Sequence, residues 1–189
     1  IRGPIDPNYP GLPGPIELVL LQTENFGDLR TSGFDVGFKW RALATLFGRF
    51  GFGLDGTYVS TFSIPGFGEL AGNNNGPYAI PRWRHYASAD WNYGPWSATL
   101  AQVFQNGYDE VDTRYCDDMG CPTRRVGSYS VWNVQGQYTG LRNTTLTVGV
   151  KNLFDRDPPW VLFPQLGFDG GYADPRGRTF YARLAYAFR

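Results

Sequence analysis

Two cysteines offer the clearest chemistry in this sequence. Cys116 and Cys121 lie in TRYCDDMGCPTRR, a C-x4-C spacing inside a polar, turn-rich segment. A zinc site would need two more ligands, and the only other candidate is His85, the single histidine of the chain. The spacing therefore favours a local disulfide, which implies an oxidising compartment, over a pair of free thiols in a reduced protein.

The sequence contains no motif for catalysis. GxSxG, Walker and metal-ligand motifs are absent, and His85 has no Ser or Cys nucleophile near it. In an alternating strand His85 shares a face with Trp83 and Ala87, so a structural histidine at an interface is favoured over a catalytic base. We therefore predict that the protein is not an enzyme and has no cofactor.

Three groups of loop residues could contact a ligand, and each has a simpler interpretation. Segment 63–81 is uncharged except for Glu69, and its Asn amides could hydrogen-bond a sugar or simply be solvated. Aromatic side chains could stack on a ligand ring or pack within the loop. An acidic segment could hold Ca²⁺, but a solvated loop, or one that a cation bridges to an anionic partner, is favoured. The candidates are Asn73, Asn74, Asn75, Trp160, Phe163 and Phe168 for ligand contact, and Asp109, Glu110, Asp112, Asp117 and Asp118 for the cation.

Composition narrows the class of protein. The 189 residues include 17 basic and 17 acidic side chains, and this zero net charge argues against a nucleic-acid binder. Aromatic residues reach 17%, which excludes a disordered chain. The most apolar run, 16–21, contains Glu17 and is far shorter than a membrane-spanning helix requires. Abundant Gly and aromatic residues with few Lys indicate an all-β protein.

Period-two alternation is the dominant pattern. It predicts eight strands, each near or above the length of a tilted membrane-spanning strand. Short and long links alternate, apart from the link at 27–28, which is short where a long one is expected. Short turns at one rim and long loops at the other are typical of an antiparallel outer-membrane barrel. The strands are expected at 16–26 (the least regular), 33–41, 46–62, 82–93, 96–105, 128–138, 145–154 and 178–188, with long loops at 63–81, 106–127 and 155–177.

A soluble β-sandwich is the alternative for such alternation. The polar faces carry mixed charge, Gly and Gln, which suits a water-filled lumen, and the expected strands are longer than the five or six residues or so typical of a sandwich. Arg49, Asp55, Arg82, Arg84 and Asp90 fall on that polar face. Aromatic residues gather near strand ends, as an interfacial girdle would: Trp40, Phe62, Trp83, Tyr93, Trp96, Tyr138 and Phe188. These features favour the membrane barrel.

The C-terminal segments VKNLFDRDPP (150–159) and GYADPRGRTFYARLAYAFR (171–189) resemble the end of TonB-dependent outer-membrane receptors. A weaker resemblance extends upstream through ENFGDLRTSGFDVGFKW and RWRHYASADWNYGPWSATL. The family usually ends on the aromatic residue, whereas here Arg189 follows Phe188. The residues that match are Val150, Asn152, Leu153, Phe154, Asp155, Asp174, Pro175, Gly177, Arg178, Phe180, Tyr181 and Phe188.

This resemblance implies that the chain is the last eight strands of a barrel of about 22 strands. Residues 1–15 would be a loop remnant, and residues 16–189 the C-terminal part of the transmembrane barrel. The implied location is the outer membrane of a Gram-negative bacterium, with the C-terminus periplasmic and the long loops extracellular. Phe180, Leu184, Tyr186 and Phe188 would form the assembly signal.

The implied function is a receptor segment for TonB-dependent uptake of a scarce nutrient: a siderophore, cobalamin, an oligosaccharide or a peptide. The implied partners are the rest of the barrel and its plug, TonB through an N-terminal part, the barrel-assembly machinery and lipopolysaccharide, but no nucleic acid. Lipopolysaccharide would be the anionic partner that a cation bridges to the acidic segment. The alternative is a stand-alone eight-stranded barrel with a structural or adhesive role.

Overall fold

A computed structural model describes residues 2–19, 27–74, 79–162 and 167–188. Regular structure is almost entirely β, apart from one short 3-10 turn, η1 (Thr113–Tyr115). Among the described residues no helix is long and apolar enough to cross a membrane. The prediction of an all-β, antiparallel fold is confirmed.

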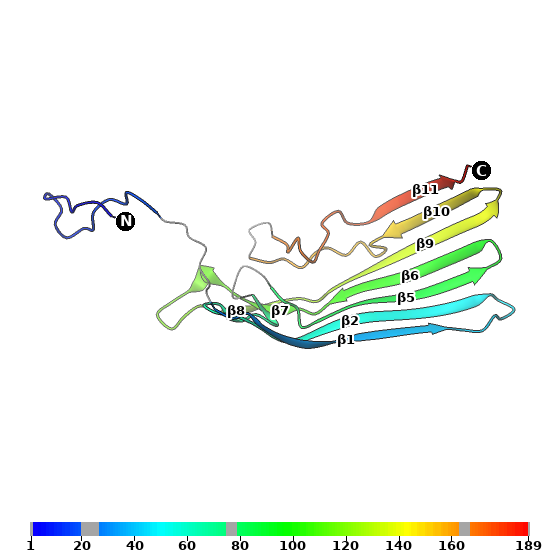
Figure 1. Ribbon diagram of the computed structural model, residues 1–189, viewed down its shortest axis with the longest axis horizontal. Helices are drawn as coiled ribbons and strands as arrows, with labels where there is room; N and C mark the ends of the chain where they lie inside the picture. Colours follow the sequence, from blue (N-terminus) through cyan, green and yellow to red (C-terminus); the bar gives the residue numbers. More distant parts are fainter. Residues whose placement is uncertain (1, 20–26, 75–78, 163–166, 189) are drawn as a thin grey trace.

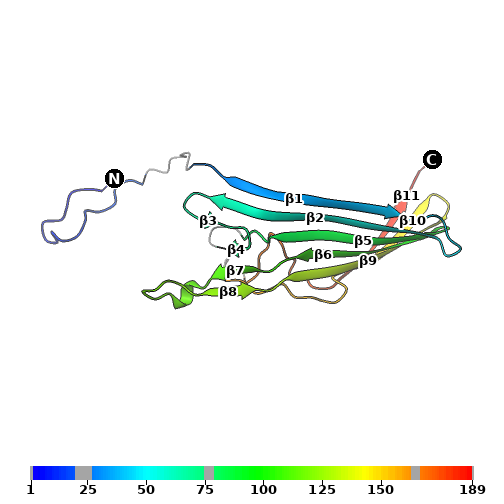
Figure 2. The ribbon, with the colours of Figure 1, turned by 90° about the horizontal axis from the view of Figure 1, so that it is seen from below.

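Seven long strands form one antiparallel sheet in which neighbours in sequence are neighbours in space (Figure 1). The short strand β3 (Gly68–Glu69) pairs with the end of β2. The outermost long strands, β1 and β11, do not pair with each other, so the described sheet is not closed (Figure 2). The long strands are β1 (Arg30–Arg41), β2 (Arg49–Ile64), β5 (Trp83–Tyr93), β6 (Trp96–Gln105), β9 (Tyr129–Leu141), β10 (Thr144–Lys151) and β11 (Thr179–Tyr186).

The predicted strands agree with these seven within a few residues, and β6 agrees at both ends. The first predicted strand, 16–26, differs. Residues 16–19 form no strand, and only Ile16 makes an isolated bridge, to Arg2. Residues 20–26 lie outside the described part of the chain. Residues 46–48, expected in the next strand, belong to the turn before β2.

Short links and long loops lie at opposite ends of the sheet, as predicted. Gly94 and Asn143 adopt positive φ (54° and 55°) in the links between β5 and β6 and between β9 and β10. Both conformations are ones that Gly and Asn tolerate best in tight hairpin turns. The C-terminus lies at the end of the short links, and the long loops lie at the other end (Figure 1).

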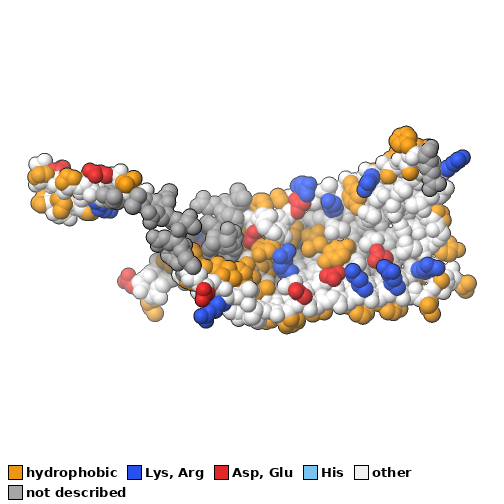
Figure 3. All heavy atoms as spheres, in the orientation of Figure 1, with side chains coloured by type: hydrophobic (Ala, Val, Ile, Leu, Met, Phe, Trp, Pro, Cys, Tyr) orange, Lys and Arg blue, Asp and Glu red, His pale blue; other side chains and the backbone are white. Residues whose placement is uncertain are grey.

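The registers place polar and apolar side chains on opposite faces of the sheet. Lys39, Gly53 and Ser88 share one face, whereas Phe38, Leu54 and Ala87 share the other. Figure 3 shows Lys, Arg, Asp and Glu spread over one face. We call this the inner face, and the apolar one the outward face. Large side chains exposed on the outward face include Phe34, Phe38, Trp40, Phe52, Leu100, Val148, Phe180 and Leu184.

One predicted side-chain direction is wrong because β2 carries an irregularity. The β1–β2 register shifts between Ser32 and Gly33, so that Gly33 pairs with Val59 but Ser32 pairs with Thr61. The extra residue reverses the alternation beyond it. Phe62, predicted in the outward girdle, therefore pairs with Thr31 and faces inward, where both line the hollow described below.

The long loops contain a second, smaller sheet that the sequence pattern did not predict. Strand β4 (Asn73–Asn74) pairs in parallel with β7 (Tyr108–Val111), which pairs antiparallel with β8 (Thr123–Val126). We call the described residues of loops 65–81, 106–127 and 152–178 the loop cluster. Its buried apolar side chains include Leu70, Ala71, Ala79, Pro81, Tyr108, Val126 and Val161.

Candidate functional site

Glu110 joins the loops of the loop cluster. Its side chain is only 1% exposed, on strand β7, where alternation turns it into the cluster. It accepts a hydrogen bond from Arg124 Nε at 2.7 Å, within an ion pair. It also accepts from the backbone N–H of Leu162, at 3.1 and 3.2 Å. A buried carboxylate is stable only when charge and hydrogen bonds compensate it, so Glu110 fixes loop 106–127 against loop 152–178.

Trp160 lies beside Glu110, half in solvent. The Arg124 guanidinium carbon lies 4.5 Å from the centroid of its ring, and that of Arg114 lies 5.4 Å away. Arg124 also donates to the Trp160 carbonyl oxygen. Both guanidinium groups are ion-paired, with Glu110 and Asp112 respectively. The Trp160 ring thus already contacts two cations. Its stacking on a ligand stays a prediction.

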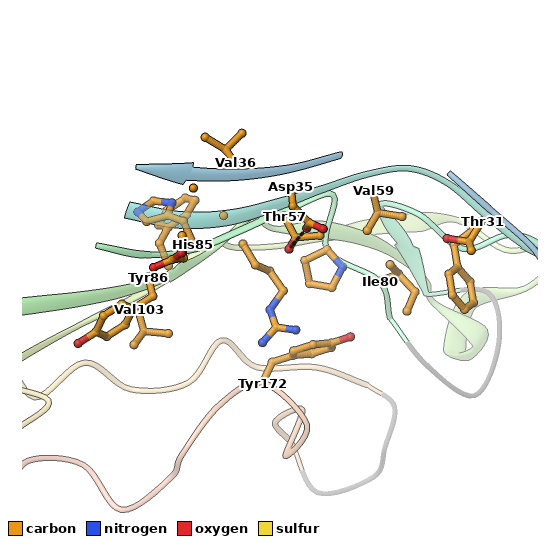
Figure 4. Close-up of a pocket in the computed structure, with 17 residues that line it drawn as sticks. Thr31, Asp35, Val36, Thr57, Val59, Ile80, His85, Tyr86, Val103 and Tyr172 are labelled. Atoms are coloured by element: carbon orange, nitrogen blue, oxygen red, sulfur yellow. Dashed lines mark hydrogen bonds between the residues drawn. The ribbon is translucent and has the colours of Figure 1, made fainter. Parts of the chain in front are cut away.

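The inner face is hollowed where it meets the loop cluster. Figure 4 shows Tyr172 lying across the hollow from β1 and β2, and the Arg84 guanidinium carbon lies 4.7 Å from the centroid of its ring. The Tyr172 hydroxyl donates to the Ala79 carbonyl oxygen at 2.8 Å, and burial raises the pKa of that hydroxyl. Thr57 donates to Asp35 at 2.6 Å on the floor. The hollow has a volume of about 760 Å³.

Polar and charged side chains continue along the inner face toward the short links. Thr99 donates to Asp90 at 2.7 Å, and Tyr181 donates to Gln135 at 2.9 Å. Lys39, Arg41 and Arg49 line a second hollow at the short-link end. At the opposite, loop-bearing end of the sheet, Arg82 donates to the Ser60 carbonyl oxygen at 2.6 Å. The inner face can therefore bind polar partners or water.

Asn73 and Asn74 lie within the loop cluster. Asn73 and Asn74 form β4 and pair with Asp109 and Glu110. Asn74 is buried, and the Asn73 amide donates to the Glu69 carbonyl oxygen at 3.4 Å. Asn75 and Phe163 lie outside the described residues. Contact of these residues with a ligand stays a prediction.

The five acidic residues are dispersed. Asp109 pairs with Arg125 (3.1 Å), Glu110 with Arg124, and Asp112 with Arg114 (2.7 Å). Asp117 accepts from the Met119 N–H within a turn. Within the described ranges no group of three or more His, Cys, Asp or Glu residues could hold a metal ion. Ca²⁺ binding stays a prediction, and three of the five carboxylates are engaged in ion pairs.

The remaining candidates lie at a loop tip and along the outward face of the sheet. Cys116 and Cys121 are linked by a disulfide at the tip of loop 106–127. Phe180, Leu184 and Tyr186 are exposed on the outward face of β11, and Phe188 packs edge-on against Tyr186 beyond the strand. Their role in assembly stays a prediction.

His85 faces outward with Trp83 and Ala87, as alternation predicts, and accepts a hydrogen bond from the Trp83 indole at 2.8 Å.

A comparison with known protein families identifies the family of this chain. A family described as TonB dependent receptor-like, beta-barrel matches residues 3–153. The chain belongs to this family. Membership places it in a barrel of the Gram-negative outer membrane. No curated protein matches the chain.

Two solved structures share the fold of this TonB-dependent receptor segment. Both are mutants of the ferric enterobactin receptor PfeA from Pseudomonas aeruginosa. They are 20% and 21% identical to the chain, with TM-scores of 0.59 and 0.60. Each comparison covers 87% of this chain and 23% of the other, so the chain spans less than a quarter of the receptors it matches.

Proposed function

We propose that this chain is the C-terminal barrel segment of an outer-membrane receptor that imports a scarce nutrient with energy supplied through TonB. The observation that carries the proposal is the family match over residues 3–153 on a sheet with an apolar outward face and a charged inner face. The open sheet supports a segment rather than a complete eight-stranded barrel. Unpaired backbone groups at β1 and β11 would each cost several kcal/mol in lipid, so both strands need neighbours.

The partners follow from that incompleteness. We propose that β1 and β11 pair with other strands of the same barrel, and that a plug occupies the inner face. Lys39, Arg41 and Arg49 are positioned to contact such a plug at the short-link end. TonB would act through an N-terminal part, and the barrel-assembly machinery would recognise β11. In this arrangement the short links and the C-terminus are periplasmic, and the loop cluster is extracellular.

Among nutrients, a ferric siderophore is the first to test because the two similar structures are of a ferric enterobactin receptor. The hollow beside Arg84 and Tyr172 supports binding of a ligand that combines polar and ring groups. Cobalamin, oligosaccharide and peptide transport are the other outcomes of the same test.

The test is growth of a deletion strain complemented with the complete receptor gene, under iron limitation and with one candidate nutrient at a time. We expect growth with one nutrient class only, and its loss when TonB is also deleted. A complemented strain whose growth does not depend on TonB would contradict the proposal. Protease treatment of intact cells tests the orientation, because only an extracellular loop cluster is cleaved from outside.

A further inference from the structure

The hollow beside Tyr172 has more acidic than basic side chains. Among the described residues that line it, Asp35 on β1 and Asp55 on β2 are acidic, and Arg84 on β5 is basic. His85 borders the hollow as well, but its side chain belongs to the outward face. The hollow therefore has a negative net charge at neutral pH.

The two carboxylates lie close to each other on the floor of the hollow. Asp35 pairs with Thr57 and Gly37 with Asp55, so the two Asp residues are diagonal neighbours on one face, with β-carbons about 7 Å apart. Thr57 donates a hydrogen bond to Asp35 at 2.6 Å (Figure 4). Within the described ranges neither carboxylate forms an ion pair. Gly37 places no side chain over Asp55, so both carboxylates can bind a cationic group of a ligand.

Arg84 lies on the same face and offers hydrogen-bond donors. It pairs with Thr57, which in turn pairs with Asp35, so its strand lies about 10 Å from β1. Its guanidinium carbon lies 4.7 Å from the centroid of the Tyr172 ring, and Tyr172 is held by its hydrogen bond to Ala79. A guanidinium that packs its face against a ring keeps the N–H groups of its edge for acceptor oxygens. Arg84 can therefore donate to oxygen atoms of a ligand whose cationic group lies at β1 and β2.

The rest of the hollow suits the body of a small molecule. Val59, Phe62 and Ile80 contribute apolar side chains to its wall. Its volume of about 760 Å³ lies within the range of about 300 to 1,000 Å³ that small-molecule sites occupy. A matching ligand has acceptor oxygens near Arg84, aliphatic segments along the wall and a cation near Asp35 and Asp55.

Ferric siderophores of two chemical types differ in how well they meet this description. Three catecholate groups leave their Fe³⁺ complex strongly anionic, whereas three hydroxamate groups, each with one negative charge, neutralise the iron. Asp35 and Asp55 would repel an anionic complex, with Arg84 alone to offset them. A neutral hydroxamate complex meets no such repulsion, and its oxygens can accept from Arg84.

We propose that the hollow binds a ferric hydroxamate complex that carries a free ammonium group. Asp35 and Asp55 bind the ammonium and so determine specificity, while Arg84 donates to the hydroxamate oxygens. This inference rests on the proposed function, because it names the class of nutrient that the same hollow would take. It separates this receptor from one that imports an anionic catecholate complex.

The test compares two ferric complexes that differ only at the amine. Ferrioxamine B has a free ammonium group, and its N-acetylated form has none. Both are loaded with radioactive iron, and their Kd values for the complete receptor, purified from outer membranes in mild detergent, are measured by equilibrium dialysis. We expect wild type to bind ferrioxamine B about tenfold more tightly than the acetylated form, as for one charge-assisted hydrogen bond.

Four variants assign this preference to residues. Asp35→Asn and Asp55→Asn each remove a negative charge at almost unchanged size, and should reduce the preference to about threefold or less without weakening the acetylated form. Arg84→Gln should instead weaken both complexes equally. Asp90→Asn is the matched control, because Asp90 also accepts from a Thr hydroxyl on the inner face, at 2.7 Å. It lies six residues along β5 from Arg84, about 20 Å away, so the preference should stay unchanged.

Heat-modifiable migration first shows that each variant is folded. Equal binding of the two complexes by wild type overturns the proposal, and so does the absence of binding by either. A preference that survives both Asp35→Asn and Asp55→Asn, or that falls equally in Asp90→Asn, overturns the role of the two carboxylates. Tighter binding of ferric enterobactin, a catecholate complex, than of ferrioxamine B overturns the substrate class.

The binding assay requires neither TonB nor transport, so the two proposals can fail separately. TonB-independent growth of a strain whose receptor prefers the free amine contradicts only the proposed function. TonB-dependent uptake by a receptor that binds both complexes equally contradicts only this inference.

Discussion

The membrane-facing sheet and the loop cluster are stabilised by different physics. In the sheet, long ladders of backbone hydrogen bonds join strands whose large apolar side chains remain exposed, such as Phe38, Val148 and Leu184. In the loop cluster, Tyr108 and Val126 are almost fully buried around short strands. The sheet therefore depends on lipid and neighbouring strands, whereas the loop cluster packs like a small soluble domain. A substitution in one of these regions should therefore leave the stability of the other unchanged.

The largest effect is expected at Glu110. Glu110→Ala leaves Arg124 without its buried partner and the Leu162 N–H without its acceptor, and should destabilise the loop cluster by about 3 to 5 kcal/mol. Hydrogen exchange should rise in segments 106–127 and 158–162 but stay unchanged in β5 and β6. Asp109→Ala is the control, because its pair with Arg125 is exposed and worth about 1 kcal/mol or less. Equal exchange in both variants would contradict the central role of Glu110.

A charge on the outward face should affect the sheet instead. Leu100→Arg exposes a guanidinium to lipid near the middle of β6 and should cost about 2 to 4 kcal/mol of unfolding free energy in bilayers. Thr99→Arg places the same group on the inner face opposite Asp90 and should cost much less. Unfolding in denaturant, followed by heat-modifiable migration, measures both. A greater loss with Thr99→Arg would reverse the assignment of the faces.

Removing the disulfide should loosen only the tip of one loop. Replacing both Cys116 and Cys121 by Ser should destabilise that tip by about 2 kcal/mol, the value expected for so short a closed loop. Trypsin should then cleave faster after Arg114. Asp118→Ser, in the same turn, is the control with both cysteines intact. A change in the exchange of β10 would show that loop tip and sheet are not independent.

The smallest effect concerns pH at Asp112. The hydrogen bonds from Arg114 hold the pKa of this carboxyl at about 2, below its ordinary 3.8. A lowered pKa means that the ion pair stabilises the fold fully above pH 3.8, and that this contribution is lost as the pH falls to about 2. Pepsin cleavage near η1 should therefore rise over that window in wild type. Asp112→Asn should be cleaved readily throughout, with a flatter pH dependence.

The sequence predicts the sheet well because each strand has two different faces. Alternation of apolar and polar residues is regular only where one side meets lipid and the other a polar lumen, as from Trp96 to Gln105. It fails at Phe62, because one extra residue in β2 reverses the pattern and nothing in the composition marks the irregularity. Strands of two to four residues, such as β4 and β8, are too short to show a period.

The contacts of the candidate site residues were harder to predict, because they depend on how segments that are apart in the sequence pair in the fold. The sequence groups Glu110 with other acidic residues, whereas the fold buries it against Arg124, fourteen residues later. Arg124 and Arg125 lie six and seven residues after Asp118, the last acidic residue of the segment, and could have suggested ion pairs in place of a cation site. The outward direction of His85 was predicted, but the contact of its Nε2 with Gln102 Oε1, at 3.2 Å, depends on the register between β5 and β6.

The parallel pairing of β4 with β7 has a consequence for engineering. Asn73 and Asn74 hydrogen-bond into a strand from the next loop, and Glu110 on that strand holds the loop after it. Each loop therefore helps to stabilise the conformation of the other two. Attempts to alter ligand specificity by grafting loops from a related receptor should exchange the three as a set, because a single graft would meet a surface shaped for a different neighbour.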